Sequence, residues 1–212
     1  MSQHPNHGFW KMSSYLFDGL GKHDTNKDDG WHVEWPNIGV PSRFARCEID
    51  STWPNNIVFA VRKGKHCTMA FPDMPISQPV PVVSGRVKAL FEGLAPGAVQ
   101  LLPVRLEFMD KPVADSPYWI MNLLRMIDCV DESRSNWSIG YGGLKSYRSW
   151  ILDKSRIPSD AMIFRVLNAE SSVVVTDEAR KRVEQVGITG VGFAELGYLG
   201  LRGPTWKPGL VE

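Results

Sequence analysis

VVSGRVKALFEGLAPGAV, residues 82–99, is the stretch that decides the fold. Two valines precede Ser84, and serine is a favourable residue at the N-cap of a helix. Gly93 and Pro96 mark the end of the helical pattern. The apolar residues between them have the i, i+3, i+4, i+7 spacing of one buried helix face: Val87, Leu90, Phe91 and Leu94. The stretch therefore predicts a strand, a short amphipathic helix over residues 84–94 and the start of another strand.

The same pattern returns near the end of the chain. VVTDEARKRVEQVGITGV, residues 174–191, aligns without gaps to residues 82–99, so that Thr176 matches Ser84. Thr176 is a good N-cap and Gly187 suits the left-handed end of a helix, which predicts a second helix over residues 177–186. The likeness has two explanations, an internal repeat or the general similarity of short capped helices between strands. A repeat would give a pseudo-symmetric sheet that carries two helices.

Other apolar segments predict strands on both sides of a proline-rich connector. Four prolines fall between residues 72 and 81, which favours an extended segment and an organisational boundary near residue 80. Residues 118–130 are nearly all apolar; they fit a strand or a helix, and we favour a long central strand. Residues 18–42 read as loops, and residues 132–146 as a loop or an irregular hairpin. The remaining predicted strands lie within residues 8–16, 57–62, 98–108, 147–153, 161–167, 173–175 and 191–193.

These segments predict an α+β fold with a mixed or antiparallel sheet and two short amphipathic helices. We expect a loop- and strand-rich N-terminal lobe over residues 1–80, an α+β domain over residues 81–202 and an irregular tail over residues 203–212. Whether the boundary near residue 80 separates two domains or two lobes of one core stays open at this point.

Composition restricts the class of partner. The chain carries 24 basic and 23 acidic residues, for a net charge of +1, so no strong field favours nucleic acid or an anionic membrane. No stretch of about 18 apolar residues is present, and residues 1–14 lack the apolar centre of a secretory signal. We therefore expect a cytoplasmic protein that contacts neither a membrane nor nucleic acid directly.

Motifs of catalysis and metal binding are missing or incomplete. The five histidines precede residue 80 and lack the i, i+4 spacing of a helical zinc site. Residues 23–31 (HDTNKDDGW) resemble a calcium loop, but glycine comes one position late and the final glutamate is missing. We expect no metal, no cofactor and no catalytic residue. The alternative is a small enzyme that uses the acidic cluster of Asp128, Asp131 and Glu132, in which a buried Asp128 would have a raised pKa.

Tryptophans offer a binding interpretation. The chain has eight, and several fall in stretches that read as loops, where large aromatic side chains often form interface hot spots. The competing interpretation is that they cover a core beneath long loops. Our candidate binding residues are three tryptophans and three acids: Trp31, Trp35, Trp137, Asp128, Asp131 and Glu132.

Ordered blocks after the connector resemble a known bacterial family. They are VVSGRVKALFEGLAPGAVQLLPVRL, YWIMNLLRMIDCVD, WILDKSRIPSDAMIFRV and VVVTDEARKRVEQVGITGVGF, which together span roughly residues 80–195. The series is similar to the immunity proteins of polymorphic toxin systems that are placed eleventh in the Imm series. The resemblance implies a non-enzymatic protein that binds and neutralises the C-terminal domain of a cognate toxin encoded by the adjacent gene, with a nuclease as one class of toxin. A structural homo-oligomer is the remaining alternative.

Overall fold

The computed structural model describes residues 6–13, 30–36, 44, 46–65, 67, 70–77, 80–114, 117–139 and 145–196. The predicted tail over residues 203–212, the calcium-like residues 23–29 and most of the loop predicted over residues 18–42 lie outside them. The helices are α2 (Gly85–Leu94), α3 (Asp177–Val186) and the short 3-10 helix η2 (Lys154–Arg156). The strands are β1 (Phe9–Ser13), β2 (Trp31–Glu34), β3 (Val58–Lys63), β4 (Val82–Val83), β5 (Val99–Phe108), β6 (Lys111–Pro112), β7 (Tyr118–Leu123), β8 (Met126–Ile127), β9 (Asn136–Ile139), β10 (Lys145–Ser149), β11 (Ile163–Val166), β12 (Ala169–Thr176) and β13 (Gly192–Glu195).

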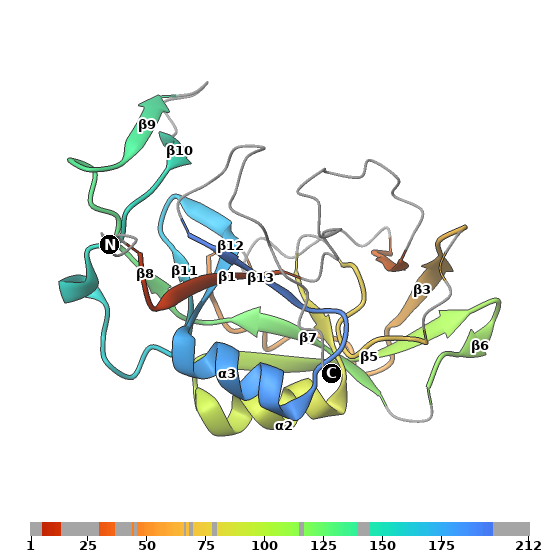
Figure 1. Cartoon of the computed structure of the whole chain (residues 1–212). Coiled ribbons are helices and arrows are strands. Elements are labelled where there is room, and N and C mark those ends of the chain that lie inside the picture. The colour runs from red at the N-terminus through yellow and green to blue at the C-terminus, as the bar shows by residue number, and fades with distance from the viewer. Residues whose placement is uncertain are drawn as a thin grey trace.

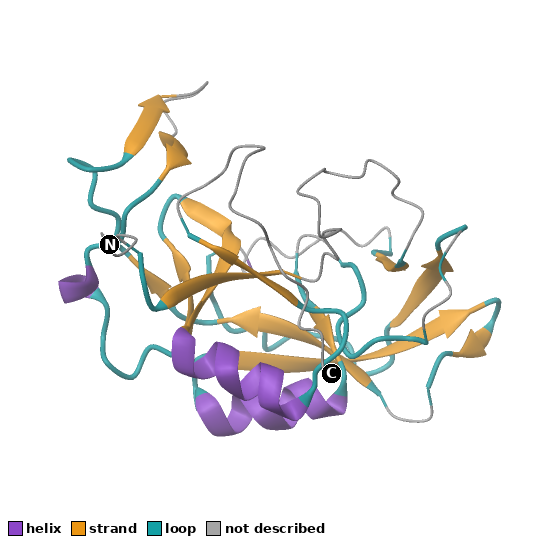
Figure 2. Ribbon diagram, viewed as in Figure 1, coloured by secondary structure: helices purple, strands orange, loops and turns teal. Residues whose placement is uncertain are grey.

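The predicted α+β class is confirmed. In the described residues the strands form one sheet in the order β13-β1-β12-β11-β8, a second in the order β2-β3-β5-β7-β4, and a separate hairpin of β9 and β10. The parallel pairs β3–β5 and β8–β11 make the sheets mixed, while the other pairs are antiparallel. Both long helices lie side by side beneath the sheets (Figures 1 and 2).

Each large sheet contains strands from both sides of residue 80. β1 lies between β12 and β13, and β3 pairs with β5. Strands from both sides of residue 80 therefore share the two large sheets, and the division of the chain at residue 80 stays a prediction.

The internal repeat is a repeat of structure. Each unit consists of a strand, a helix and a second strand that runs parallel to the first. A strand from another part of the chain, the filling strand, lies between these two strands and pairs antiparallel with both, in the orders β4–β7–β5 and β12–β1–β13. The registers also agree, because Val83 pairs with Trp119 just as its equivalent Val175 pairs with Trp10. The two filling strands come from different parts of the chain, so an alignment of residues 82–99 with residues 174–191 shows only part of each unit.

Side chains repeat with the backbone. In each unit a basic residue of the helix lies over the tryptophan of the filling strand, 5.7 Å from the ring centroid in the first unit and 3.9 Å in the second. The same basic residue pairs with a glutamate one turn later, at 2.6 Å and 2.9 Å. These residues are Lys88, Trp119 and Glu92 in the first unit, and Arg180, Trp10 and Glu184 in the second. The sequence repeat therefore encodes equivalent cation–π and i, i+4 contacts.

The helix predictions are confirmed apart from one position. Thr176 accepts a hydrogen bond from the backbone N–H of Ala179 at 3.2 Å, and Gly187 adopts the left-handed conformation with φ of 67°. The exception is Val186, which continues the apolar spacing of Ala179 and Val183 but is 42% exposed. Val186 is the last residue of α3, where the chain turns at Gly187, so it lies beyond the part of the helix that covers the core.

Two strand predictions need correction. Residues 31–34 were read as loop but form β2, because β3 supplies an antiparallel partner that a local pattern does not reveal. The long strand predicted over residues 118–130 is broken after Leu123, and its two parts join different sheets as β7 and β8. The apolar run thus carries the chain from one sheet to the other.

A buried carboxylate fixes the two helices relative to the proline-rich segment. Asp73 accepts hydrogen bonds from the hydroxyl of Ser84 at 2.6 Å, from Arg86 at 2.9 Å, and from both the backbone N–H and the hydroxyl of Thr189 at 3.0 Å. Ser84 precedes α2 and Thr189 follows α3, and Arg86 also donates to the carbonyl of Val186 at 2.6 Å. Ser84 therefore holds the N-cap position without making the expected side-chain cap, since its hydroxyl is used by Asp73.

Candidate functional site

The hairpin of β9 and β10 stands apart from both large sheets (Figure 1). β9 pairs with β10 in antiparallel register, and all four residues of β9 are exposed. Successive side chains alternate between the two faces of a strand, so Trp137 and Ile139 share one face while Asn136 and Ser138 share the other. Trp137 is 36% exposed and Ile139 67%. β9 therefore presents one apolar face, formed by Trp137 and Ile139, and one polar face.

A short neck ties this hairpin to the body. Val130 and Leu152 form an antiparallel bridge, and the N–H of Asp131 donates to the carbonyl of Ile151 at 2.8 Å. The hydroxyl of Ser135 donates to the carbonyl of Asp131 at 2.6 Å and accepts from the N–H of Ile151 at 2.9 Å. The Val130–Leu152 bridge and the two hydrogen bonds of Ile151 join the segment just before β9 to the segment just after β10, so they hold the base of the hairpin.

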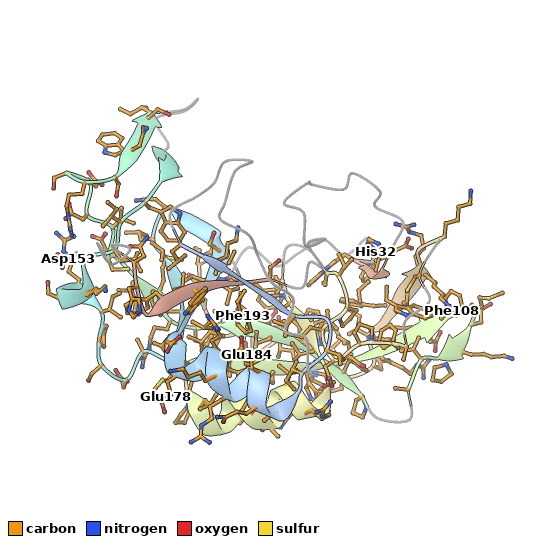
Figure 3. The ribbon with its side chains drawn as sticks, in the orientation of Figure 1. His32, Phe108, Asp153, Glu178, Glu184 and Phe193 are labelled. Atoms are coloured by element: carbon orange, nitrogen blue, oxygen red, sulfur yellow. The ribbon has the colours of Figure 1, made fainter. Side chains whose placement is uncertain are left out.

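Two matching turns flank the neck. The carboxylate of Asp131 accepts from the N–H and hydroxyl of Ser133 at 3.1 Å and 2.6 Å, and it pairs with Arg134 at 2.5 Å. Asp153 makes the same contacts within its own Asp-Lys-Ser-Arg turn, residues 153–156 (Figure 3). The hydrogen bonds from Ser133 and Arg134 lower the pKa of Asp131 to about 2. Both carboxylates are therefore ionised and satisfied by their own turns at neutral pH.

Comparison with protein families places the chain. The model of the immunity protein family Imm11 matches residues 6–197, which is most of the chain and includes both sheets and the hairpin. The chain belongs to the Imm11 family. Membership indicates a toxin-neutralising immunity function. Among curated proteins, no relative matches the chain.

The hairpin of this Imm11 protein brings together three of the predicted binding residues. The indole N–H of Trp137 donates to the backbone carbonyl of Glu132 at 3.3 Å, and Asp131 lies one residue before Glu132 in the neck. Asp128 precedes the neck and is also exposed. A tryptophan, two acidic residues and an exposed third acid thus lie along one continuous segment.

Trp31 and Trp35 lie elsewhere, on and after β2. Trp31 packs edge-on against Phe71 and Phe108, with ring centroids 5.2 Å and 5.3 Å away. The indole N–H of Trp35 lies 3.3 Å from the hydroxyl of Ser77. Both side chains are half-buried and pack against the core of the second sheet, whose buried residues include Phe59. These two tryptophans therefore cover a core, which was the alternative to their being exposed binding residues.

Sequence reasoning did not select Ile139. Its signal was the alternation of Trp137 and Ile139 within a serine-rich stretch, which predicts a strand with one apolar face. This signal was too short to identify a strand on its own, because only two apolar residues alternate before Gly140. A strand this short becomes visible only with its partner β10.

The geometry of the acidic cluster does not match what the enzyme alternative requires. That alternative needs a buried Asp128, whereas Asp128 is exposed. Burial instead acts on its neighbour and raises the pKa of the Cys129 thiol to about 12, with a further contribution from the charge of Asp128. Within the described residues, no group of three or more His, Cys, Asp or Glu is placed to hold a metal ion. No helix among these residues is long and apolar enough to cross a membrane.

Proposed function

We propose that this Imm11 protein neutralises its cognate toxin by binding the toxin domain one-to-one, with the apolar face of β9, in the β9–β10 hairpin, at the interface. Family membership supports the toxin as partner. The exposed pair of Trp137 and Ile139 on one hairpin face is the observation that carries the choice of surface.

The hairpin has the physical properties of a binding element. Tryptophan is enriched among residues that dominate interface energies, because a large rigid side chain buries much apolar area at a small entropic cost. The neck orders its base in the free protein through the Val130–Leu152 bridge and the turn at Asp131. An element ordered before binding loses less conformational entropy when the complex forms.

Charge suggests how such binding would act. The net charge of +1 provides no strong acidic field, and the carboxylates of Asp131 and Asp153 are satisfied within their turns. We therefore propose neutralisation through shape and apolar contact, without electrostatic mimicry of nucleic acid even where the toxin is a nuclease. Asp128 and Glu132 would contribute at the polar rim of the interface. We place this event in the cytoplasm of the producing cell and assign the toxin to the adjacent gene.

Co-expression provides the test. The toxin domain encoded next to this chain is induced alone, with the chain, and with the Trp137→Ala variant. We expect growth only when the wild-type chain is present, together with a co-purifying complex whose mass corresponds to one copy of each protein. Growth arrest in the presence of soluble wild-type chain, with no complex recovered, contradicts the proposal. A mass of the free chain at low concentration that corresponds to several copies would favour the homo-oligomer instead.

A further inference from the structure

A second exposed apolar surface lies far from the hairpin. A groove of roughly 510 Å³ opens beside the β5–β6 turn. Figure 3 places Phe108, at the end of β5, on the opposite side of the molecule from Asp153 at the foot of the hairpin. Six apolar side chains line the groove: Trp31, Phe71, Phe108, Met109, Pro112 and Val113.

The aromatic wall of this groove is fixed by ring contacts. Trp31 meets Phe71 at an interplanar angle of 73° and Phe108 at 83°. Phe71 in turn packs edge-on against buried Tyr118, with ring centroids 5.3 Å apart. The wall is thus continuous with the core of the second sheet.

Met109 at the rim is exposed in an unfavourable backbone conformation. β5 and β6 pair through Phe108 and Lys111, which leaves Met109 and Asp110 as a two-residue turn. Both turn residues have positive φ, 52° and 61°, a conformation that Asn-Gly adopts readily and methionine rarely does. Met109 is 77% exposed. Backbone strain in a native turn is a recognised sign of functional constraint, and here it places an apolar side chain at the mouth of a groove.

Basic side chains border the same groove. The ammonium group of Lys63 lies 5.2 Å from the ring centroid of Trp31, and Lys111 lines the groove directly. Both lysines are exposed, and neither makes an ion pair within the described residues. Asp110 in the turn is the acidic residue between Met109 and Lys111. Two exposed cations beside an apolar surface favour an apolar ligand with acidic neighbours.

We propose that this groove docks an acidic segment of a partner protein, which inserts one apolar side chain against the aromatic wall while its carboxylates face Lys63 and Lys111. The lining favours a protein segment over a small metabolite, because small-molecule sites combine apolar walls with several converging polar groups, and Lys111 is the polar residue of this lining. The inference concerns a surface separate from the hairpin and does not depend on toxin binding there.

Peptide titration tests the docking proposal. The isotope-labelled full chain is titrated, with NMR detection, with the capped hexapeptide EDLFDE and with its basic counterpart KKLFKK. We expect EDLFDE to shift the indole signal of Trp31 and the methyl signal of Met109, with at least tenfold weaker binding of KKLFKK. Equal binding of the two peptides, or shifts confined to the hairpin, overturns the proposal. N-acetylphenylalanine amide is the third probe, and binding as tight as that of EDLFDE would identify a small-molecule pocket and overturn it as well.

Two variants separate docking from folding. Met109→Gly relieves the left-handed backbone, so we expect an unchanged or higher Tm and at least fivefold weaker binding of EDLFDE. Ile49→Ala is the matched control, since Ile49 is also a largely exposed aliphatic residue, at 65%, and does not line the groove. Wild-type affinity in Met109→Gly would overturn the proposal. Because no probe is a toxin, such a failure leaves the toxin-binding proposal standing.

Discussion

Replacing Asp73 with asparagine should destabilise the chain through the contact between its two helical units. The substitution keeps the size of the side chain but removes the charge that accepts from Ser84, Thr189 and Arg86. Hydrogen bonds to a charged acceptor are about twice as strong as neutral ones, so each of the three bonds from Ser84 and Thr189 should lose about 1 kcal/mol. The side chain of Arg86 is half exposed, which limits the loss from its ion pair to about 0.5 kcal/mol.

The expected total is about 3.5 kcal/mol in the free energy of unfolding, or a fall in Tm of about 10 °C for a chain of this size. Burial alone would raise the pKa of Asp73, but the hydrogen bonds from Ser84 and Thr189 and the charge of Arg86 outweigh it and hold this pKa below its ordinary value. The ionised carboxylate therefore stabilises the fold above the pKa of the unfolded chain, and this stabilisation is lost as pH falls through the folded pKa.

Urea unfolding of the wild type, Asp73→Asn and Asp128→Asn, followed by circular dichroism at pH 7 and pH 2.5, measures both effects. Asp128 is exposed, so Asp128→Asn is the matched control and should lie within about 0.5 kcal/mol of wild type. The difference between wild type and Asp73→Asn should be larger at pH 7 than at pH 2.5. A difference below 1 kcal/mol at pH 7, or one that is equally large at both pH values, would refute the reasoning.

Four other predictions rest on single sites. Gly190→Ala should lower the free energy of unfolding by about 3 kcal/mol, because Gly190 has φ of 77° and a Cβ there would clash with the backbone carbonyl oxygen of Met74. Gly93→Ala, in the open side of α2, should raise it by about 0.5–1 kcal/mol in the same urea titration, and a loss there would contradict the helix assignment. Cys129 is fully buried with its thiol pKa raised to about 12, so it should resist iodoacetamide at pH 8 until urea unfolds the chain; rapid alkylation of the native protein, located by mass spectrometry, would be inconsistent with this burial. Arg180→Gln should cost about 1 kcal/mol, because the guanidinium carbon lies 3.9 Å from the ring centroid of Trp10. Once Trp10 is replaced by leucine in a double-mutant cycle, the cost should fall to about 0.3–0.5 kcal/mol, which is the loss of the ion pair with Glu184.

Local features of the sequence predicted the helices well. Residues 177–186 carry their own start and stop in Thr176 and Gly187, and both behave in the structure as their residue types suggest. Ser84 shows the limit of this reasoning. Its position at the start of α2 was predictable. Its hydroxyl, however, donates to Asp73 in the proline-rich segment, and no local pattern in the sequence links these two residues.

Pairings between distant segments were not predictable. β1 inserts between β12 and β13, and Trp10 pairs there with Val175. Nothing local to residues 9–13 specifies that position, because it depends on the space between β12 and β13, two strands that lie more than 150 residues later in the chain. The same non-local pairing made β2 unrecognisable as a strand and gave Trp31 a partly buried position.

The candidate site was predictable in part. The tryptophan and the acids of residues 131–137 were selected for their types, and the structure places them in one neck and hairpin. Ile139 completes the apolar face, but it becomes evident only once β10 is known to pair with β9.

The affinity of the hairpin face for the toxin domain tests the central claim most directly. The dissociation constant of the complex is measured by calorimetry for the wild type, Trp137→Ala, Ile139→Ala and Ile49→Ala. Ile139 and Ile49 are matched at 67% and 65% exposure, so a difference between their variants reports location instead of hydrophobicity. The account predicts at least a 30-fold loss for Trp137→Ala, which is about 2 kcal/mol, a loss of about tenfold for Ile139→Ala and a change of less than about twofold for Ile49→Ala. Wild-type affinity in both hairpin variants, with their folds intact, would contradict it.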